Sequence, residues 1–459
     1  MNSLQSTRRD FLKAVGVSAT VGPYAANAAG AGAAKRPNVI LYVVDDQGST
    51  DAGCYGNPVI KTPGLDDLAA NGTRFTHAFC TTASCSASRS VILSGLYNHY
   101  NGQYGHQHDY HHFETFPHVR SLPSLLAEAG YRTARWGKYH VAPDEVYQFE
   151  QVIRGGSPVQ GADNCKPFIA AQSDKPFFLY FCTTEPHRPF RREGSDEFDP
   201  QDVIVPPYLP DSPECREELA KYYGSVQRAD AGLKRLIEIL RQTGRWEDTV
   251  VIYISDNGIA FPGAKTTLYE PGMRLPCVVR NPFASKTGVV TDAMVNYADM
   301  TPTILDLCSA TPKDYAFHGR SFASVLRDPK AKGWDEIYAS HTFHEITMYY
   351  PMRVVRTRRY KLIWNIAHGL PYPFASDLWA SETWQGVVKR GETVYGKRSV
   401  DAYLHRPRFE LYDLQEDPDE VKNLADDPRH ASILGEMKDK LKAFQKRTRD
   451  PWILKWDYE

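Results

Sequence analysis

Two almost wholly apolar runs, each followed within two residues by an aspartate, limit the folds that this chain can adopt. They are residues 38–44 and 249–254, and such uninterrupted apolar character is typical of a parallel strand covered on both faces. Residues 176–181 repeat the pattern. Helical stretches at 121–129 and 217–243 lie between the runs, and each is followed by a glycine that can end a helix. We therefore predict an α/β fold built around buried parallel strands.

Acidic side chains follow two of these strands at their carboxyl ends, where ligands bind in open α/β sheets. Asp45 and Asp46 follow the first run, and Asp256 and Asn257 follow the second. Taken alone, each aspartate is more often a turn or capping residue. Together the four residues supply only hard oxygen donors, which suit Ca²⁺ better than zinc or copper. We predict a Ca²⁺ site at this edge of the sheet.

Basic residues follow two further strands and are expected at the same edge. A weaker strand at 133–136 leads to Lys138 and His140, and the strand at 176–181 leads to His187. Lysine presents a point charge to an anion, and histidine transfers protons near neutral pH. Taken singly, such residues are usually surface charges or structural histidines. Their joint placement makes them candidates for a site.

The run Cys85-Ser86-Ala87-Ser88-Arg89 is the most specific motif of the chain. A helix can start at Cys85, and a helix N-terminus holds anions through its free N–H groups and partial positive charge. Arg89 lies four residues further on, on the same helical face, where its guanidinium can neutralise a nucleophile or an anionic substrate. The five residues alone also fit a buried structural cysteine beside a surface arginine.

This run and the following residues 90–95 resemble the signature of the type I sulfatases. The resemblance implies that a formylglycine-generating maturation enzyme oxidises Cys85 to formylglycine, whose hydrated aldehyde is the nucleophile. It also implies a Ca²⁺ ion held by Asp45, Asp46, Cys85 in its modified form, Asp256 and Asn257. Ala87 stands where proline is commoner in the motif.

The same resemblance implies roles for the basic residues. Arg89, Lys138 and Lys265 would stabilise negative charge on the sulfuryl oxygens. His187 or His140 would protonate the leaving group. Lys265 stands where we expect an arginine, so the charge is kept but the two-pronged geometry is lost.

Longer runs resemble the sulfamidases, the N-sulfoglucosamine sulfohydrolase branch of the family. These are residues 95–105, 109–113, 255–262 and 344–353, within a resemblance from about residue 37 to 452. It implies hydrolysis of the N-sulfate of terminal N-sulfoglucosamine in heparin or heparan sulfate, with Glu185, His344 and Glu345 near the sugar. Glu185 stands where we expect aspartate. Two alternatives stay open: an O-sulfatase or arylsulfatase with the same core, and a non-catalytic protein that binds sulfated sugar if Cys85 is unmodified.

The resemblance also implies the architecture. We expect an alkaline-phosphatase-like α/β/α sandwich over residues 36–334, followed by a smaller α+β domain over 335–459 with antiparallel strands and a helix near 431–447. A length of 459 residues suits one large domain and a smaller one. The resemblance leaves a homodimer open.

Residues 1–34 are predicted to be an export signal. Arg8 and Arg9, within the run 6–13, resemble a twin-arginine motif, and a mildly apolar stretch rich in small residues follows. That stretch is too short to be a stable membrane anchor. We expect a periplasmic or secreted protein.

Composition excludes two classes of partner. Hydrophobic residues make up 42% and charged residues 24%, as in folded globular proteins, and the formal net charge is −1. A nearly neutral chain argues against general binding to nucleic acid or a membrane surface, so a sulfated glucosamine-containing saccharide must be held by a local pocket. The eight cysteines lack the Cys-x-x-Cys spacing of zinc sites.

Overall fold

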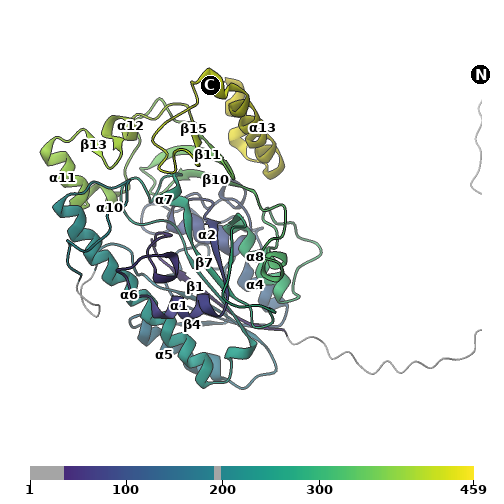
Figure 1. Cartoon of the computed structure of the whole chain (residues 1–459). Coiled ribbons are helices and arrows are strands. Elements are labelled where there is room, and N and C mark those ends of the chain that lie inside the picture. Colours follow the sequence, from purple (N-terminus) through teal and green to yellow (C-terminus); the bar gives the residue numbers. More distant parts are fainter. Residues whose placement is uncertain (1–35, 191–197, 459) are drawn as a thin grey trace, which may run out of the picture. The chain divides into compact units, whose positions relative to one another are not determined.

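A computed structural model describes residues 36–190 and 198–458, and the predicted export signal lies outside them. These residues form a nine-stranded sheet, a four-stranded sheet and a two-stranded sheet, with the helices around them (Figure 1). The nine strands of the large sheet are β1 (Asn38–Val44), β2 (Thr73–Phe79), β3 (Arg132–Gly137), β4 (Gln151–Ile153), β5 (Phe177–Cys182), β6 (Thr249–Ser255), β7 (Arg274–Arg280), β8 (Val289–Thr291) and β9 (Val295–Asn296).

The large sheet is parallel except at one strand. Its order is β4-β3-β5-β1-β6-β7-β2-β8, with β9 beside β2, and β7 alone runs against its neighbours. The four predicted strands at the centre are confirmed, and β1 has the predicted bounds. The prediction did not include β2 or the reversal at β7. Because β2 is parallel to β6, its carboxyl end lies at the same edge as those of the central strands.

Helices cover both faces of the large sheet, since successive side chains of a strand point to opposite faces. Along β1, Val39 and Leu41 belong to one buried cluster, and Ile40 and Tyr42 belong to the other. On the first face lie α2 (Cys85–Ser94), α4 (Leu122–Glu128) and α8 (Met300–Leu307), and on the second lie α1 (Pro63–Ala70), α5 (Pro158–Ala170) and α6 (Pro213–Gln242) (Figure 1). This is the predicted α/β/α sandwich.

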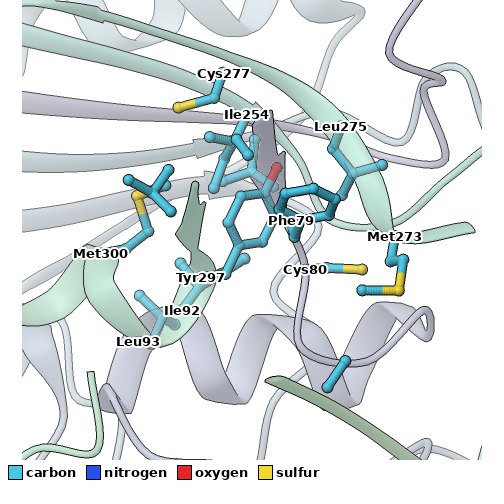
Figure 2. Close-up of a cluster of buried hydrophobic side chains, with 14 of the residues drawn as sticks. Phe79, Cys80, Ile92, Leu93, Ile254, Met273, Leu275, Cys277, Tyr297 and Met300 are labelled. Carbon is cyan, nitrogen blue, oxygen red and sulfur yellow. The ribbon is translucent and has the colours of Figure 1, made fainter. Parts of the chain in front are cut away.

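The core on the first face fixes the position of α2. Figure 2 shows Phe79 of β2, Ile254 of β6 and Leu275 of β7 gathered with Ile92 and Leu93 of α2. These five side chains are essentially inaccessible to solvent. The helix therefore cannot shift along the sheet without opening this core, and its first residue stays at the sheet's carboxyl edge.

The second sheet is antiparallel, as predicted. It consists of β10 (Glu336–Phe343), β11 (Tyr349–Thr357), β12 (Tyr360–Asn365) and β15 (Phe409–Asp413), in that order. Helix α13 (Ala431–Thr448), close to the helix predicted at 431–447, covers one face, and its Phe444 joins the cluster of Trp364. Side chains of the other face, such as Val354, join the cluster that holds α2. The boundary at residues 334–335 stays a prediction; this sheet begins at Glu336.

Shorter elements complete the described chain. They are α3 (Asn98–Asn101), α7 (Glu270–Met273), α9 (Ala323–Arg327), α10 (Ser376–Trp379), α11 (Glu382–Arg390), β13 (Val394–Tyr395), β14 (Arg398–Ser399), α12 (Val400–Leu404), α14 (Lys455–Tyr458) and single 3₁₀ turns at Gly53–Tyr55, Trp246–Asp248, Tyr297–Asp299, Pro428–His430 and Pro451–Leu454. The segment between β12 and β15 contacts α6, where Glu218 accepts a hydrogen bond from the Thr383 N–H. Across residues 36–190 and 198–458, no helix has the length and apolar character needed to cross a bilayer.

Candidate active site

Five parallel strands deliver polar residues to one edge of the large sheet. β1 and β6 end at the acidic residues Asp45 and Asp256, β3 ends at Lys138, and β5 leads to His187. The chain leaving β2 turns into α2, so that Cys85 starts the helix at this edge. The predicted convergence of strand ends is therefore confirmed. The nucleophile candidate reaches the same edge through β2, which the sequence analysis did not identify.

The acidic residues form one buried cluster with Cys85. Asp46 Oδ1 lies 2.6 Å from Asn257 Nδ2 and 3.7 Å from Cys85 Sγ. The Asp46 N–H donates to Asp256 Oδ1 at 3.1 Å. Asp46 has a φ of +68°, in the left-handed region that non-glycine residues rarely adopt. Such backbone strain is typical of functional sites, where the surrounding contacts compel it.

Two oxygen atoms of this cluster fit a metal site. Within the described residues, the buried Oδ1 atoms of Asp45 and Asn257 have no hydrogen-bond partner. Asp45, Cys85 and Asp256 each offer a ligand atom, and these three atoms lie within 4.8 Å of one another. Buried polar atoms without partners are rare in proteins, and the carboxylate and amide oxygens of Asp45, Asp256 and Asn257 suit a hard cation, whereas the thiol of Cys85 does not. The residues present therefore fit Ca²⁺.

Each carboxylate of the cluster also faces a basic side chain. Lys138 Nζ lies 2.7 Å from Asp45 Oδ2, Arg89 Nε lies 2.8 Å from Asp256 Oδ2, and Lys265 Nζ lies 2.9 Å from Asp46 Oδ2. Burial opposes the charge on Lys265, but Asp377 and Asp46 raise the pKa of Lys265 well above its ordinary value. Three positive charges are thus held together at this edge, where they can bind an anion.

Cys85 itself is a poor nucleophile in this setting. It is 1% exposed, and burial raises the pKa of its thiol well above the ordinary value, although Lys138 and Lys265 act in the opposite direction. Only the thiolate of cysteine is strongly nucleophilic. The residue is therefore a protonated thiol at neutral pH.

Lys265 links the cluster to His187 and to a carboxylate that the sequence analysis missed. Its Nζ lies 3.1 Å from His187 Nε2 and 2.9 Å from Asp377 Oδ2. His187 Nε2 is also 3.7 Å from Asp46 Oδ2. Asp377 comes from α10, 112 residues away from Lys265, and no motif surrounds it. Only the folded chain reveals it.

A group of histidines forms one wall of the site. The ring of His140 stacks on those of His106 and His108, with centroids 4.8 Å and 4.9 Å away. His344 connects this group to the start of α2, through His106 Nε2 at 3.0 Å and Ser84 Oγ at 2.9 Å. Burial, with nearby Lys138, lowers the pKa of His140 well below its ordinary value. His140 is therefore neutral at neutral pH.

His106 and His108 were also missed, although a signal existed. Four histidines occur within seven residues, at positions 106, 108, 111 and 112. Burial, with Lys265 and Lys138, lowers the pKa of His106 to about 2. These rings therefore present uncharged, flat surfaces to the site.

The predicted sugar-contacting residues line a pocket of about 620 Å³ above the cluster. Glu185 is held by a two-pronged pair in which Arg228 Nε and Nη2 each lie 3.2 Å from one of its oxygens. Glu345 Oε1 accepts a hydrogen bond from the Ser376 N–H at 3.0 Å. Of the predicted residues, Asp45, Lys138, His140, Glu185, His187, Lys265, His344 and Glu345 line the pocket. Buried at the same edge are Asp46, Cys85, Arg89, Asp256 and Asn257.

The sulfatase family model matches residues 37–310, so the chain belongs to the sulfatase family and is a hydrolase of that class. Its fold is alkaline-phosphatase-like. A second model, the C-terminal part of N-sulphoglucosamine sulphohydrolase, matches residues 263–369. The chain is 38% identical to human N-sulphoglucosamine sulphohydrolase over 91% of its own length and 92% of the relative's.

Other proteins similar to this chain are named for different substrates. The chain is 29% identical to an ulvan-active sulfatase of Formosa agariphila, over 87% of this chain and 78% of the relative. A protein solved with its substrate D-glucosamine-2-N,6-O-disulfate superposes with a TM-score of 0.69 at 20% identity, covering 91% of this chain and 99% of that one. The phosphonate monoester hydrolase of Agrobacterium radiobacter gives 0.70 at 19%, covering 90% and 96%. The fold alone therefore does not define the substrate.

Proposed function

We propose that this sulfatase removes the N-sulfate group from terminal N-sulfoglucosamine in heparin or heparan sulfate. The observation that carries the proposal is the 38% identity to human N-sulphoglucosamine sulphohydrolase over nearly the whole length of both chains. The pocket supports it, because Lys138 and Lys265, with Arg89 buried at the same edge, can bind a sulfate group beside carboxylates and a histidine suited to an amine leaving group.

We propose that Cys85 is converted to formylglycine and that Asp45, Asp46, Asp256, Asn257 and position 85 hold Ca²⁺. When present, these groups supply an oxygen nucleophile and a divalent charge beside the sulfate. The unpartnered oxygens of Asp45 and Asn257 support the metal assignment. The buried, protonated thiol of Cys85 supports the need for conversion.

The basic residues would bind and polarise the substrate's sulfuryl group. Arg89, Lys138 and Lys265 already lie within 4 Å of the acidic cluster, and their charges require no rearrangement of solvent when negative charge develops. Pre-placed charges in a site shielded from water are among the largest contributions to catalysis. Arg89 also donates to the Lys138 carbonyl at 3.0 Å, which fixes the two cations relative to each other.

His187 is the better proton donor to the departing nitrogen. It lines the pocket, and its Nε2, which accepts from the Lys265 ammonium at 3.1 Å in this structure, would carry the donated proton once a bound sulfate group draws Lys265 toward itself. His140 also lines the pocket, but its lowered pKa leaves it neutral, so it has no extra proton to donate. We therefore propose that His187 is the general acid and that His140 contacts the substrate as an uncharged group.

Glu185, His344 and Glu345 would contact the sugar. Arg228 fixes the Glu185 carboxylate, and Ser84 and His106 fix the two nitrogens of His344. Fixed polar groups can recognise hydroxyls without losing conformational freedom on binding. This rigidity supports a pocket shaped for one terminal sugar unit.

The test is a product assay on purified protein. N-sulfoglucosamine should release sulfate and glucosamine faster than glucosamine 6-sulfate releases sulfate. Faster release from the 6-O-sulfate would leave only the general sulfatase assignment. A mass spectrum of the peptide that contains Cys85 separates an enzyme, with an aldehyde at this position, from a protein that only binds sulfated sugar.

We further propose that residues 1–34 direct export to the periplasm or beyond, and that a formylglycine-generating enzyme acts on the chain. Arg8 and Arg9 support export. Fractionation of cells that express the whole chain tests it: Arg8→Lys combined with Arg9→Lys should retain the protein in the cytoplasm. A homodimer stays a prediction that sedimentation of the pure protein tests.

A further inference from the structure

Asp377 lines the pocket and is held there by an ion pair with Lys265. Its Oδ2 lies 2.9 Å from Lys265 Nζ and 4.0 Å from His187 Nε2. The side chain is 21% exposed and lines the pocket. Its other oxygen, Oδ1, is buried and has no hydrogen-bond partner in the part of the chain that the structure describes.

A buried carboxylate oxygen without a partner is costly, because it has lost its water and gained nothing in return. Oxygens of other pocket carboxylates are engaged. Arg228 binds both oxygens of Glu185, and Glu345 Oε1 binds Ser376, the residue that precedes Asp377. Asp377 thus has an unsatisfied acceptor, Oδ1, which a rotation of the carboxylate would bring into the pocket near His187, whose Nε2 lies 4.0 Å from Oδ2.

The Asp377 carboxylate is ionised at neutral pH. Burial acts to raise the pKa of Asp377, but Lys265 and His187 outweigh it and hold the pKa at about 2. An ionised acceptor beside a proton donor favours groups that carry N–H bonds and disfavours groups that carry only lone pairs.

We propose that Asp377 determines specificity for sulfamates over sulfate esters by accepting a hydrogen bond from the bridging N–H of the substrate. This inference rests on the proposed function and names the residue that would set its selectivity. A sulfamate presents one hydrogen on the bridging nitrogen. A sulfate ester presents a bridging oxygen with lone pairs and no hydrogen, which faces Oδ1 repulsively and leaves it unpaired.

The same carboxylate would also bind the amine product. When the S–N bond breaks, its electron pair would stay on nitrogen, which would take one proton from His187 in its imidazolium form, while the sulfuryl group would pass to the oxygen nucleophile that the proposed conversion of Cys85 supplies. The free amine then gains a further proton from water and becomes an ammonium. Asp377 supplies the opposite charge to that ammonium. It therefore binds the nitrogen in both substrate and product.

The test compares Asp377→Asn with the wild-type holoenzyme on N-sulfoglucosamine and on 4-nitrophenyl sulfate. The amide keeps the shape but removes the charge. We expect kcat/KM for the sulfamate to fall about 100-fold, as is typical when one placed polar group is lost from an active site. The rate on the aryl sulfate should be unchanged or higher. Product inhibition by glucosamine should weaken about 10-fold, the size of one charged hydrogen bond, whereas weak inhibition by glucose should not change.

Asp109→Asn is the matched control, because it removes one negative charge from the same pocket at a side chain that is 72% exposed. It should leave the ratio of the two activities unchanged. Equal losses of activity on both substrates in Asp377→Asn would mean that the residue only positions Lys265. That result would overturn this inference but not the proposed function. A wild-type holoenzyme without activity on N-sulfoglucosamine would instead overturn the proposed function, and the inference with it.

Discussion

Arg89 and Asp256 form a fully buried ion pair, with 2.8 Å between Arg89 Nε and Asp256 Oδ2. Arg89 belongs to α2, which starts at the proposed nucleophile position, and Asp256 follows β6 and belongs to the proposed metal site. The pair therefore fixes the distance between the two functional parts of the site. Because both side chains are out of contact with water, loss of either partner leaves the other charge uncompensated.

Asp256→Ala should destabilise the protein and weaken metal binding together. Removing one partner of a buried pair costs roughly 3–5 kcal/mol. In scanning fluorimetry the variant should have a lower Tm, and added Ca²⁺ should raise the Tm of the wild type more than that of the variant. Asp174→Ala, at an exposed position, is the control and should change neither value. An equal response of variant and wild type to Ca²⁺ would contradict the metal assignment.

Removal of divalent metal should abolish sulfate release, and added Ca²⁺ should restore it. The reason is that Asp45, Asp46, Asp256 and Asn257 supply oxygen donors, which bind Ca²⁺ preferentially. The measurement is activity after chelation and dialysis, with metal content followed by emission spectrometry. Full activity in a preparation shown to be free of metal would disprove the requirement.

Cys85→Ser should bind substrate but not turn it over, provided that the expression host does not convert serine at this position. A serine offers one hydroxyl, so a sulfated enzyme has no second hydroxyl with which to expel sulfate. Intact-protein mass spectrometry should find sulfate attached to the variant after incubation with substrate. Cys85→Ala, which has no hydroxyl, is the matched control and should stay unsulfated. Normal turnover by Cys85→Ser would refute the mechanism.

Glu345→Gln should reduce N-desulfation more than hydrolysis of aryl sulfates. Glu345 Oε1 accepts the Ser376 N–H, and Ser376 precedes Asp377, so a weaker acceptor loosens the residue beside His187. We expect a loss of about 10-fold on the sulfamate, the size of one charge-assisted hydrogen bond. Steady-state rates on both substrates measure it. Equal losses on the two substrates would argue that Glu345 supports the fold and not the selectivity.

The pair of Arg353 and Asp450 should make stability depend on pH. Two contacts, of 2.6 Å and 2.9 Å, join these buried side chains, and although burial opposes ionisation of Asp450, Arg353 lowers its pKa below the ordinary value. A lowered folded-state pKa gives stability that is fully present above the unfolded pKa of about 3.9 and is lost as the pH falls through the folded value.

Asp450→Asn tests that linkage. At pH 7 the variant should be less stable by roughly 3–5 kcal/mol, because the Arg353 charge is left without its partner. The difference in Tm between variant and wild type should shrink below about pH 4, the ordinary range of an aspartate. Asp211→Asn, which disrupts the exposed pair with Arg216, should change the Tm little at any pH. A difference that stays constant down to pH 3 would show that Asp450 acts through packing alone.

The central strands were predictable because their side chains contact protein on both faces. Residues 39–44 of β1 are fully buried and wholly apolar, and no competing pattern fits such a run. In contrast, β2 contains Arg74, Thr76 and His77, which are partly exposed, and the strand lies near one end of the sheet. Its alternating pattern was a weaker signal, and it was missed for that reason.

Site residues were predictable where they follow a buried strand. Asp45 and Asp256 are examples, because the chain direction places both at one edge of the sheet. Helix α6 was predicted to begin at Glu217 but begins at Pro213. The residue before it, Ser212, caps the helix, because its side chain accepts a hydrogen bond from the Cys215 N–H. The sequence contained this capping signal. Asp377 had no such signal, since only the docking of α10 brings it to Lys265.

The burial of α2 determines whether Cys85 can be modified before or after the protein folds. All ten of its residues, including Cys85, are inaccessible to solvent, and side chains from three strands pack against it. A modifying enzyme must reach the Cys85 side chain, which is buried in the finished fold. Any conversion of Cys85 must therefore happen before the large sheet closes over the helix. If activity requires the proposed conversion, a chain that folds before it would remain inactive.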